Sequence, residues 1–594
     1  MSLFQELKHR NVLRAGATYV VFSWLVVQVV ETVFPAFGIG DAAVRIVVIT
    51  LGILFVPALV LAWVFEITPD GLKRETDLDR TQPAIQAIGR KMDKSIVVIL
   101  SLALSLFALD KFLLDPARDA EMIESARLEG RTAAIAESFG DRSIAVLPFA
   151  DMSRDGDQEY FSDGISEELL NLLARIPELR VISRSSAFSF RDQNLRIPEI
   201  AGRLEVAYIL EGSVRKSGDL LRITAQLIEG PTDTHLWSET YDRPLENIFL
   251  VQDEIATAVV EQIKGTLQIS VPSQTVRDPD AYNLLLQGRH VRDQGTRESY
   301  DSAIELFRGA LELDPGYTEA WDALANIYQN QAVIGLRPAD EGFKLAREAS
   351  LAALAIDPDY APAHATLGWG AMYHEGDPAL AVGHYQRAME LDPTNPFILG
   401  AAGILLQNLG HFERGLEPIE YMVARDPVYS SGHYILGLAY IDAGRFDEAV
   451  SSLRRALTLS PGFTSAQYAI GVAQLLDGEP NLARSAFEAE SNEAWQMVGL
   501  SLIDDSALSR LIAEYGDSWA YNIAYVFAYR GEEDAAFEWL ERAVGIKDPG
   551  LGEITSESLF ANITEDPRWV PFLETLGKSP DLLSSIDFRV TIPR

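Results

Sequence analysis

Long uninterrupted runs of hydrophobic residues dominate the first part of the chain. They cover residues 15–34, 44–66 and 95–114 and are separated by polar segments. Each run is about 20 residues long, which is enough for a helix to cross roughly 30 Å of hydrocarbon. A cleavable signal peptide fits the first run poorly, because no small-residue cleavage site follows it. The pattern therefore predicts three transmembrane helices within a membrane segment over residues 1–114.

The positions of Lys and Arg predict an orientation for these helices. Lys8, Arg10 and Arg14 precede the first run, several basic residues occupy the loop 67–94, and the turn 35–43 has none. Basic loops stay on the cytoplasmic side of a membrane. We therefore expect a bacterial inner-membrane protein whose N-terminus is cytoplasmic and whose residues after 114 are periplasmic. Residues 115–140, which are charged and rich in Ala, are expected to form a linker or stalk.

After residue 140 the hydrophobic residues fall into shorter runs with two different periods. Residues 144–147 read as a short buried strand, whereas Leu169, Leu173 and Ile176 lie on one face of a helix. Two β-rich runs flank Ser217-Gly218-Asp219, which predicts a hairpin. This alternation of helices and strands predicts an α/β domain with a mixed sheet over residues 141–270.

The same domain carries several short motifs in order along the chain. They are Ile144-Ala145-Val146-Leu147-Pro148-Phe149, Phe161-Ser162-Asp163-Gly164, Glu167-Glu168-Leu169, Tyr208-Ile209-Leu210-Glu211-Gly212-Ser213-Val214 and Leu236-Trp237-Ser238-Glu239-Thr240-Tyr241-Asp242. With them the stretch 141–266 resembles the TolB-like amino-terminal domain, which is related to FlgO-type and CsgG-type periplasmic modules. The resemblance implies a module outside the cytoplasm. Members often follow a cytoplasmic adenylate-cyclase or winged-helix domain, whereas only a short basic tail precedes the first hydrophobic run here.

The dipeptide Asp-Pro recurs in the second half of the chain. It begins at Asp314, Asp357, Asp392 and Asp426, and Ser460-Pro461 continues the series. The spacing approaches about 34 residues, a period that marks a stack of identical helical units. Small residues let the two helices of a unit approach, and the proline ends the second helix.

The residues between the prolines resemble tetratricopeptide repeats. The clearest unit has His433, Leu436, Gly437, Tyr440, Ala449, Leu453, Ala456 and Pro461. Each such unit buries its hydrophobic face only against its neighbours. We therefore expect an all-α solenoid of tetratricopeptide repeats over residues 278–594, with the irregular stretches 480–515 and 567–594 acting as a cap.

The resemblance also implies a protein-binding groove on the first helix of each unit. Its positions map onto Asn326, Gln329, Asn330, Trp369, Tyr373, Gln407, Asn408, Tyr434, Asp442 and Tyr468. None of these residues is Lys or Arg, so a basic clamp for a peptide carboxylate is not expected. A groove of amides and aromatic rings suits an extended or helical protein segment, including a basic one. The alternative is that some of these residues only pack within the array.

Composition and charge exclude several classes of partner and of chemical site. The chain has 594 residues, enough for several domains, with 86 Asp and Glu against 50 Lys and Arg and a formal net charge of −36. Such a surface repels phosphate backbones, so no nucleic-acid partner is expected. The chain has no cysteine, which excludes disulfide frameworks, thiolate nucleophiles and cysteine metal sites.

The remaining candidates for catalysis or metal binding are weak. His364, His374 and His384 are too far apart in sequence to share one helical face as metal ligands. Gly577-Lys578-Ser579 is the end of a phosphate-loop pattern, but Phe572 stands where its first glycine belongs. We therefore expect no catalytic residues, no cofactor and no metal.

These features together predict a membrane-anchored periplasmic scaffold or signalling accessory that is not an enzyme. Its expected partners are proteins, including ones with basic segments, and the inner membrane; a homo-oligomer is possible. Two alternatives stay open. One is an adenylate-cyclase-type signalling protein without a recognisable catalytic domain, and the other is a component of envelope biogenesis or export.

Overall fold

The computed structural model describes residues 140, 142–154, 156–191, 193, 195–218, 220–263 and 277–593, together with scattered positions before residue 75. The chain divides into two units, Met1–Met122 and Ile123–Arg594. In the first unit, strand β1 (Phe65–Thr68) pairs antiparallel with β2 (Gly71–Arg74). Most of the predicted spans and the linker 115–140 lie outside the described residues. Within the described residues, no helix combines the length and the hydrophobicity that a membrane crossing requires.

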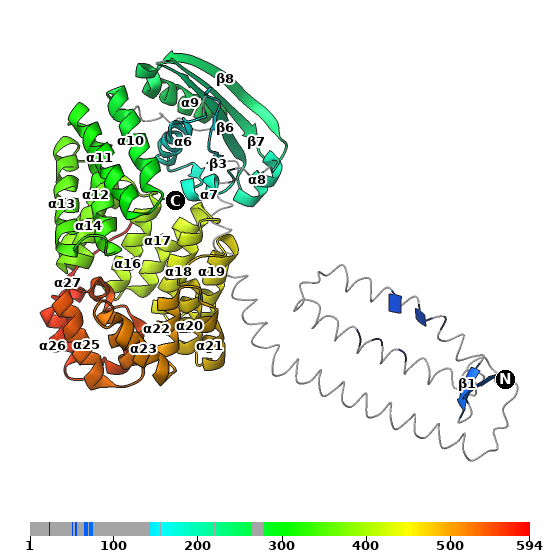
Figure 1. Cartoon of the computed structure of the whole chain (residues 1–594), viewed down its shortest axis with the longest axis vertical. Helices are drawn as coiled ribbons and strands as arrows, with labels where there is room; N and C mark the ends of the chain where they lie inside the picture. The colour runs from blue at the N-terminus through cyan, green and yellow to red at the C-terminus, as the bar shows by residue number, and fades with distance from the viewer. Residues whose placement is uncertain are drawn as a thin grey trace. The chain divides into compact units, whose positions relative to one another are not determined.

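The second unit begins with a mixed β-sheet, as the sequence predicts (Figure 1). Strand β3 (Ser143–Val146) runs parallel to both β5 (Arg180–Val181) and β6 (Tyr208–Ser217), and the short β4 (Ala150–Asp151) also pairs with β6. Strands β6, β7 (Leu220–Glu229) and β8 (Thr234–Pro244) form an antiparallel meander. The predicted hairpin joins β6 to β7, and Gly218 adopts the positive φ, 59°, that a tight turn of this kind favours.

Helices cover both faces of the sheet around its parallel strands. Helices α6 (Glu159–Ala174) and α9 (Ile248–Ile263) share a core with Ile144 and Val146. Helices α7 (Arg184–Phe188) and α8 (Ile197–Leu204) share the opposite core with Ala145 and Leu147. Successive side chains of a strand point to opposite faces, so β3 is buried on both.

The rest of the described chain is helical, as expected for a solenoid. Eight helical hairpins of the described residues follow one another. They are α10 (Pro279–Arg292) with α11 (Arg297–Leu313), α12 (Thr318–Val333) with α13 (Ala339–Ile356), α14 (Ala361–Gly370) with α15 (Pro378–Leu391), α16 (Pro396–Asn408) with α17 (Phe412–Arg425), α18 (Ser430–Asp442) with α19 (Phe446–Leu459), α20 (Ala466–Leu476) with α21 (Pro480–Ala489), α22 (Glu493–Ser501) with α23 (Asp505–Tyr515), and α24 (Ala520–Tyr529) with α25 (Glu533–Ile546).

Glycines and Asp-Pro dipeptides shape these hairpins as the repeat pattern predicts. A Cβ on Gly437 of α18 would lie 2.5 Å from Cγ of Leu453 on α19, so only glycine permits this helix spacing. The residues before the prolines, Asp357, Asp392 and Asp426, are the C-caps of α13, α15 and α17. The tetratricopeptide repeats are therefore confirmed.

The stretch 480–515 was expected to be an irregular cap, but it is helical. It forms α21, α22 and α23 and continues the stack. The ring of Phe487 fills the space that Gly471 and Gly499 leave open on either side. Gly471 follows Gly437 by 34 residues and keeps the period, but Trp495 stands where the next proline of the series would fall. The Asp-Pro pattern therefore does not identify this unit.

After α25 the chain forms short elements instead of another hairpin. They are η5 (Pro549–Glu553), η6 (Ser558–Ile563), α26 (Trp569–Thr575) and α27 (Pro580–Ser585). Figure 1 shows these elements, in orange and red, beside the middle helices of the array.

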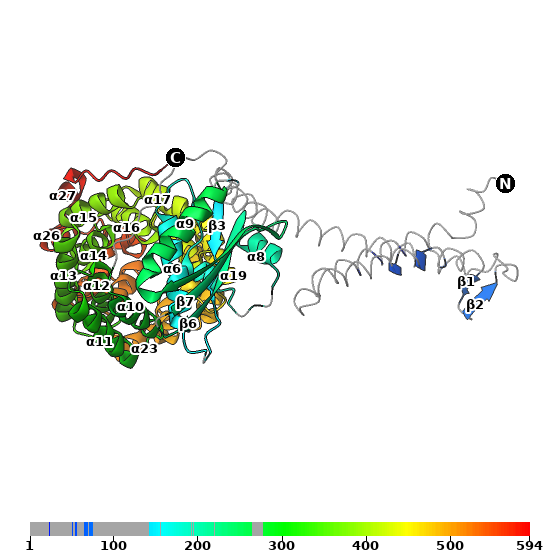
Figure 2. The same cartoon turned by 90° about the horizontal axis from the view of Figure 1, so that it is seen from above.

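The sheet and the array share one hydrophobic core. Leu286 of α10 lies so close to Gly164 of α6 that a Cβ there would clash with it. Arg289 of α10 forms an ion pair with Glu168 of α6, with 2.7 Å between Nη1 and Oε1. Figure 2 shows α6 and α9 between the sheet and the first helices of the array. The two parts therefore belong to a single folded unit.

Candidate functional site

The first helices of the hairpins form a continuous inner wall. Each first helix from α10 to α22 contacts the first helix of the next unit, up to α24. All ten residues predicted to face a groove lie on this wall, on α12, α14, α16, α18, α20 and the π-helical turn η4 (Ala371–Glu375) that extends α14. The repeat pattern therefore places the predicted residues on one surface.

The chain's own C-terminal segment, residues 548–588, lies against this wall. The hydroxyl of Tyr373 donates a hydrogen bond to Glu553. Thr555 Oγ1 donates to the carbonyl of Asn408 at 2.9 Å, and Ser558 Oγ donates to the carbonyl of Ile441 at 3.4 Å. Part of the predicted groove is thus occupied within the same chain.

Three further predicted residues bond within the array. Gln407 Nε2 donates to the carbonyl of Ala439 at 2.7 Å. The hydroxyl of Tyr434 lies 2.9 Å from Ser465 Oγ, and that of Tyr468 lies 2.9 Å from the hydroxyl of Tyr525. These contacts hold neighbouring units together, which is the packing role that the sequence left open as an alternative.

The remaining predicted residues line the start of the wall. Asn330 is exposed, Gln329 is buried with no partner for its side-chain oxygen among the described residues, and Asn326 donates to the carbonyl of Asp322. The ring of Trp369 packs against that of Tyr373, tilted by 33° with 4.3 Å between ring centroids. This part of the wall keeps polar groups available for a partner.

Three carboxylates gather where the C-terminal segment meets α18. They belong to Asp442 at the end of α18, Glu553 at the end of η5 and Glu557 before η6. Among the described residues, none of the three forms an ion pair with Lys or Arg. Desolvation inside the curved wall raises the pKa of Glu557 to about 7, and Glu553 adds repulsion. Desolvation, then Glu557 and Glu553, raises the pKa of Asp442 well above its ordinary value.

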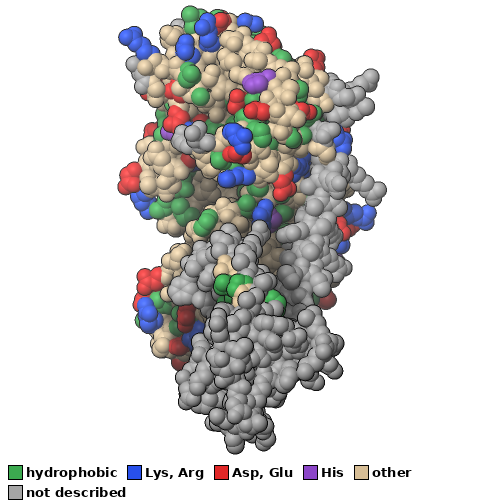
Figure 3. Space-filling view, turned by 90° about the vertical axis from the view of Figure 1, so that its right-hand side faces the viewer, with side chains coloured by type: hydrophobic (Ala, Val, Ile, Leu, Met, Phe, Trp, Pro, Cys, Tyr) green, Lys and Arg blue, Asp and Glu red, His purple; other side chains and the backbone are tan. Residues whose placement is uncertain are grey.

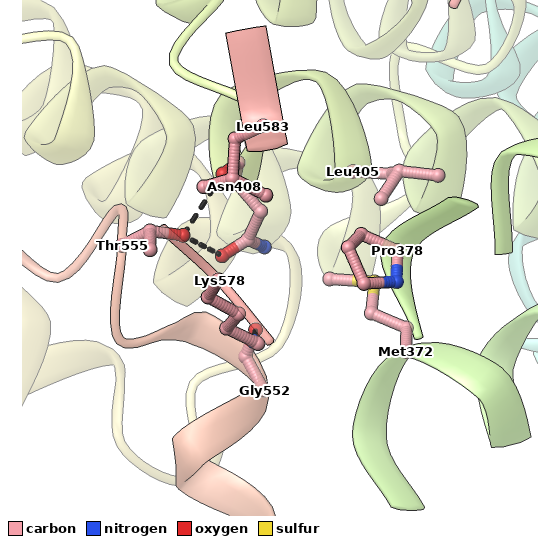
Figure 4. Close-up of a pocket in the computed structure, with 8 residues that line it drawn as sticks. All are labelled: Met372, Pro378, Leu405, Asn408, Gly552, Thr555, Lys578 and Leu583. Atoms are coloured by element: carbon pink, nitrogen blue, oxygen red, sulfur yellow. Dashed lines mark hydrogen bonds between the residues drawn. The ribbon is translucent and has the colours of Figure 1, made fainter. Parts of the chain in front are cut away.

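The cavity between the C-terminal segment and the wall is small. Met372, Pro378 and Leu405 line one side, and Asn408, Thr555, Lys578 and Leu583 lie opposite (Figure 4). Its volume of about 10 Å³ is close to that of one water molecule. This cavity therefore cannot hold an organic substrate or cofactor.

Lys578 has a structural role in this region. Its side chain is buried, and its ammonium donates to the carbonyls of Leu551, at 2.8 Å, and Gly552. Burial lowers its pKa to about 8, against the opposing effect of Glu553. The cation of the Gly577-Lys578-Ser579 motif is thus used to fasten the C-terminal segment.

The structure brings two of the three evenly spaced histidines together. The Nδ1 atoms of His364 on α14 and His384 on α15 lie 3.3 Å apart, whereas His374 stacks on Phe343. Burial, followed by repulsion from His364, lowers the pKa of His384 to about 4. Within the described ranges, no group of three or more His, Asp or Glu residues has a geometry suited to a metal ion.

Sequence reasoning did not identify Glu553, Glu557 or Tyr521 as residues of the site. The two glutamates follow the last repeat, where the period of the Asp-Pro series no longer applies. Tyr521 lies on α24, whose unit matches the repeat pattern only weakly. Glu553 and Glu557 come close to Asp442 only because the C-terminal segment returns to the wall, whereas Tyr521 lies on the wall itself.

Charge on the visible outer face is mixed. On the face in Figure 3, acidic and basic side chains are interspersed among hydrophobic ones over the described residues. The group of three carboxylates on the inner wall, none of which forms an ion pair among the described residues, differs from the mixed surface seen in that view.

Comparison with known proteins supports the repeat assignment. The tetratricopeptide repeat family matches residues 401–462 and 436–495. A protein of Rhizobium meliloti (strain 1021) named "Putative adenylate cyclase 3" is 41% identical over 189 residues, which cover 31% of this chain and 32% of the relative. The chain thus spans about a third of the length of that curated relative.

Two solved structures are similar in part. The type IV pilus biogenesis factor PilW is 18% identical with a TM-score of 0.30, covering 42% of this chain and 98% of its own. A thermophilic tetratricopeptide repeat protein of Thermus thermophilus is 23% identical with a TM-score of 0.28, covering 33% of this chain and 99% of its own.

Proposed function

We propose that this protein is a membrane-anchored periplasmic interaction scaffold or signalling accessory, in which the helical array holds a partner protein and the sheet carries a second contact surface. The proposal rests on the predicted spans 15–34, 44–66 and 95–114, on the basic loop 67–94 and on the TolB-like motifs. Tetratricopeptide arrays are suited to protein–protein interaction, and this chain contains such an array.

One observation carries the proposal. On one continuous surface, the inner wall combines the exposed amide of Asn330, the half-buried ring of Trp369 and the carboxylate of Asp442, which forms no ion pair among the described residues. Polar and aromatic groups that the fold itself does not use favour recognition of another protein.

Photo-crosslinking in living cells tests this function. A photoreactive residue at Asn330, on the inner wall, is compared with one at the exposed Glu348, on the outer helix α13. We expect a light-dependent adduct of discrete mass from position 330 and none from position 348. No adduct from position 330, or equal adducts from both positions, would refute the scaffold proposal.

The periplasmic location of the folded domains needs a separate test. A phosphatase that is active only in the periplasm, fused after residue 594, should be active, and a reporter active only in the cytoplasm should be silent. An inactive phosphatase together with an active cytoplasmic reporter would contradict the periplasmic location. The crosslinking experiment would still test the interaction role on its own.

The relative named as an adenylate cyclase favours a second candidate, a role in cyclic-nucleotide signalling. The similarity covers 31% of this chain. Purified full-length protein incubated with ATP and Mg²⁺ tests this directly. We expect no cyclic AMP above background; robust synthesis would make the enzymatic alternative the better one.

A further inference from the structure

The carboxylates of Asp442, Glu553 and Glu557 are held in place by the fold, but no cation of the described residues forms an ion pair with them. The hydroxyl of Ser558 donates a hydrogen bond to the carbonyl of Ile441. Glu557 precedes Ser558 and Asp442 follows Ile441, so this contact brings the two acidic residues near each other. Tyr373 holds Glu553 by a hydrogen bond. The nearby ammonium of Lys578 is directed at the carbonyls of Leu551 and Gly552.

A buried hydroxyl beside these carboxylates is unused. The side chain of Tyr521 is only 5% exposed, and its hydroxyl has no hydrogen-bond partner among the described residues. Its ring is fixed by edge contacts with Tyr525, at 5.7 Å between centroids, and Phe560, at 5.5 Å. The ring also lies against the start of the segment that carries Glu553 and Glu557, since a Cβ on Gly550 would lie 2.3 Å from its Cδ1 atom. Desolvation, followed by Glu557, Glu553 and Asp442, raises the pKa of the hydroxyl. Buried polar groups normally have a hydrogen-bond partner. The hydroxyl of Tyr521 is therefore a candidate to hydrogen-bond a group that another molecule supplies.

We propose that Asp442, Glu553, Glu557 and Tyr521 form an acidic pocket that receives a lysine or arginine side chain from a protein partner. The proposal rests on the scaffold function and names the chemistry that its inner wall recognises. Three acceptors and a hydroxyl oxygen match the several N–H donors of an ammonium or guanidinium group.

Aromatic rings next to the pocket strengthen this assignment. Tyr373, which bonds Glu553, also packs against Trp369. Faces of such rings attract cations at short range. The stem of a lysine or arginine can therefore pass along the wall while its charged end reaches the carboxylates.

A defined cationic probe tests the pocket in the full-length protein. Penta-lysine binding is measured by fluorescence anisotropy at physiological salt, with the fully acetylated peptide as the uncharged control. The variant D442N/E557Q removes two charges from the pocket, and E538Q/E541Q removes two charges from α25. We expect about tenfold weaker binding for the pocket variant and almost no change for the α25 variant. Equal weakening in both would show nonspecific attraction and overturn the proposal.

A localisation experiment accompanies the binding assay. Carbodiimide joins a lysine amine to a carboxylate in contact with it, forming an amide with loss of water. We expect peptide adducts concentrated on Glu553 and Glu557 in mass maps, and adducts spread evenly over exposed acids would contradict the pocket. Because D442N and E557Q relieve repulsion, thermal melting should show no loss of stability.

The two proposals can be separated by experiment. If the adduct formed from Asn330 persists and D442N/E557Q binds penta-lysine normally, the pocket is wrong while the scaffold function stands. If position 330 captures no partner, the scaffold function is wrong whatever the peptide does.

Discussion

The carboxylate of Asp426 accepts a hydrogen bond from the backbone amide of Ser183, with 3.0 Å between nitrogen and oxygen. It also accepts one from the hydroxyl of Ser186 at 2.9 Å. Asp426 belongs to the Asp-Pro series that ends the second helices of the array, whereas Ser183 begins α7 beside the sheet. A residue that the repeat pattern explains as a helix stop therefore also joins the two parts of the second unit.

Replacing Asp426 should loosen this junction. Asp426→Ala leaves buried donors without an acceptor, and we expect a loss of about 2–3 kcal/mol in the free energy of unfolding. Asp359→Ala, which removes an exposed ion pair with Arg387, should cost less than about 1 kcal/mol. Urea unfolding of both variants measures the difference. Similar losses in the two would mean that the junction adds little.

Stability should depend on pH through Glu557. Its pKa is raised from 4.5 to about 7 in the folded chain. A raised carboxyl pKa means that the folded chain binds the proton more tightly than the unfolded one. The stabilising contribution is therefore complete below pH 4.5 and is lost as the pH rises through about 7.

Comparison of E557Q with the original protein isolates that contribution. At about pH 8 we expect E557Q to be more stable by about 1–2 kcal/mol, a range discounted because Glu557 is only partly buried. The difference should shrink towards about pH 5, as thermal unfolding across this range would show. A constant difference at every pH would contradict the raised pKa.

Gly437 should tolerate no larger residue. Gly437→Val places side-chain atoms against Leu453 and Ala449, and such overpacking costs about 1–3 kcal/mol or more. Gly462→Ala is the matched control, because a Cβ there meets no atom within 4 Å. Denaturant midpoints of the two variants should therefore separate clearly. Equal midpoints would show that α18 and α19 can move apart at little cost.

Two buried tyrosines should respond in opposite directions to loss of the hydroxyl. Tyr440 donates to Glu420 at 2.9 Å, so Tyr440→Phe should cost about 1–3 kcal/mol. Tyr521 has no such partner among the described residues, so Tyr521→Phe should be neutral or stabilising by about 1 kcal/mol. Thermal unfolding of the two purified variants tests this, and a marked loss for Tyr521→Phe would reveal a bond that the structure does not contain.

Much of the fold follows from local sequence. The alternation around Ile144 and the turn at Gly218 predict strands and a hairpin, because side-chain period and backbone φ are properties of a few neighbouring residues. The Asp-Pro series predicts the hairpins up to Ser460 for the same reason. The series does not predict the unit around Phe487, because Trp495 replaces the proline that would end it. The contact of Phe487 with Gly499 on the next helix is visible only in the structure.

The site shows where local pattern stops being informative. Asn408, Tyr373 and Asp442 could be placed on one wall from their repeat positions alone, because each unit repeats the same helix geometry. The C-terminal segment that covers this wall could not be predicted from the repeat pattern. It holds Glu553 and Glu557 and contacts helices more than a hundred residues earlier in the chain. The sequence by itself thus determined the strands, the helical hairpins up to Ser460 and the helices on which the predicted wall residues lie. Only the tertiary structure decided which wall residues stay free and where unneutralised charge collects, because both depend on contacts between distant segments.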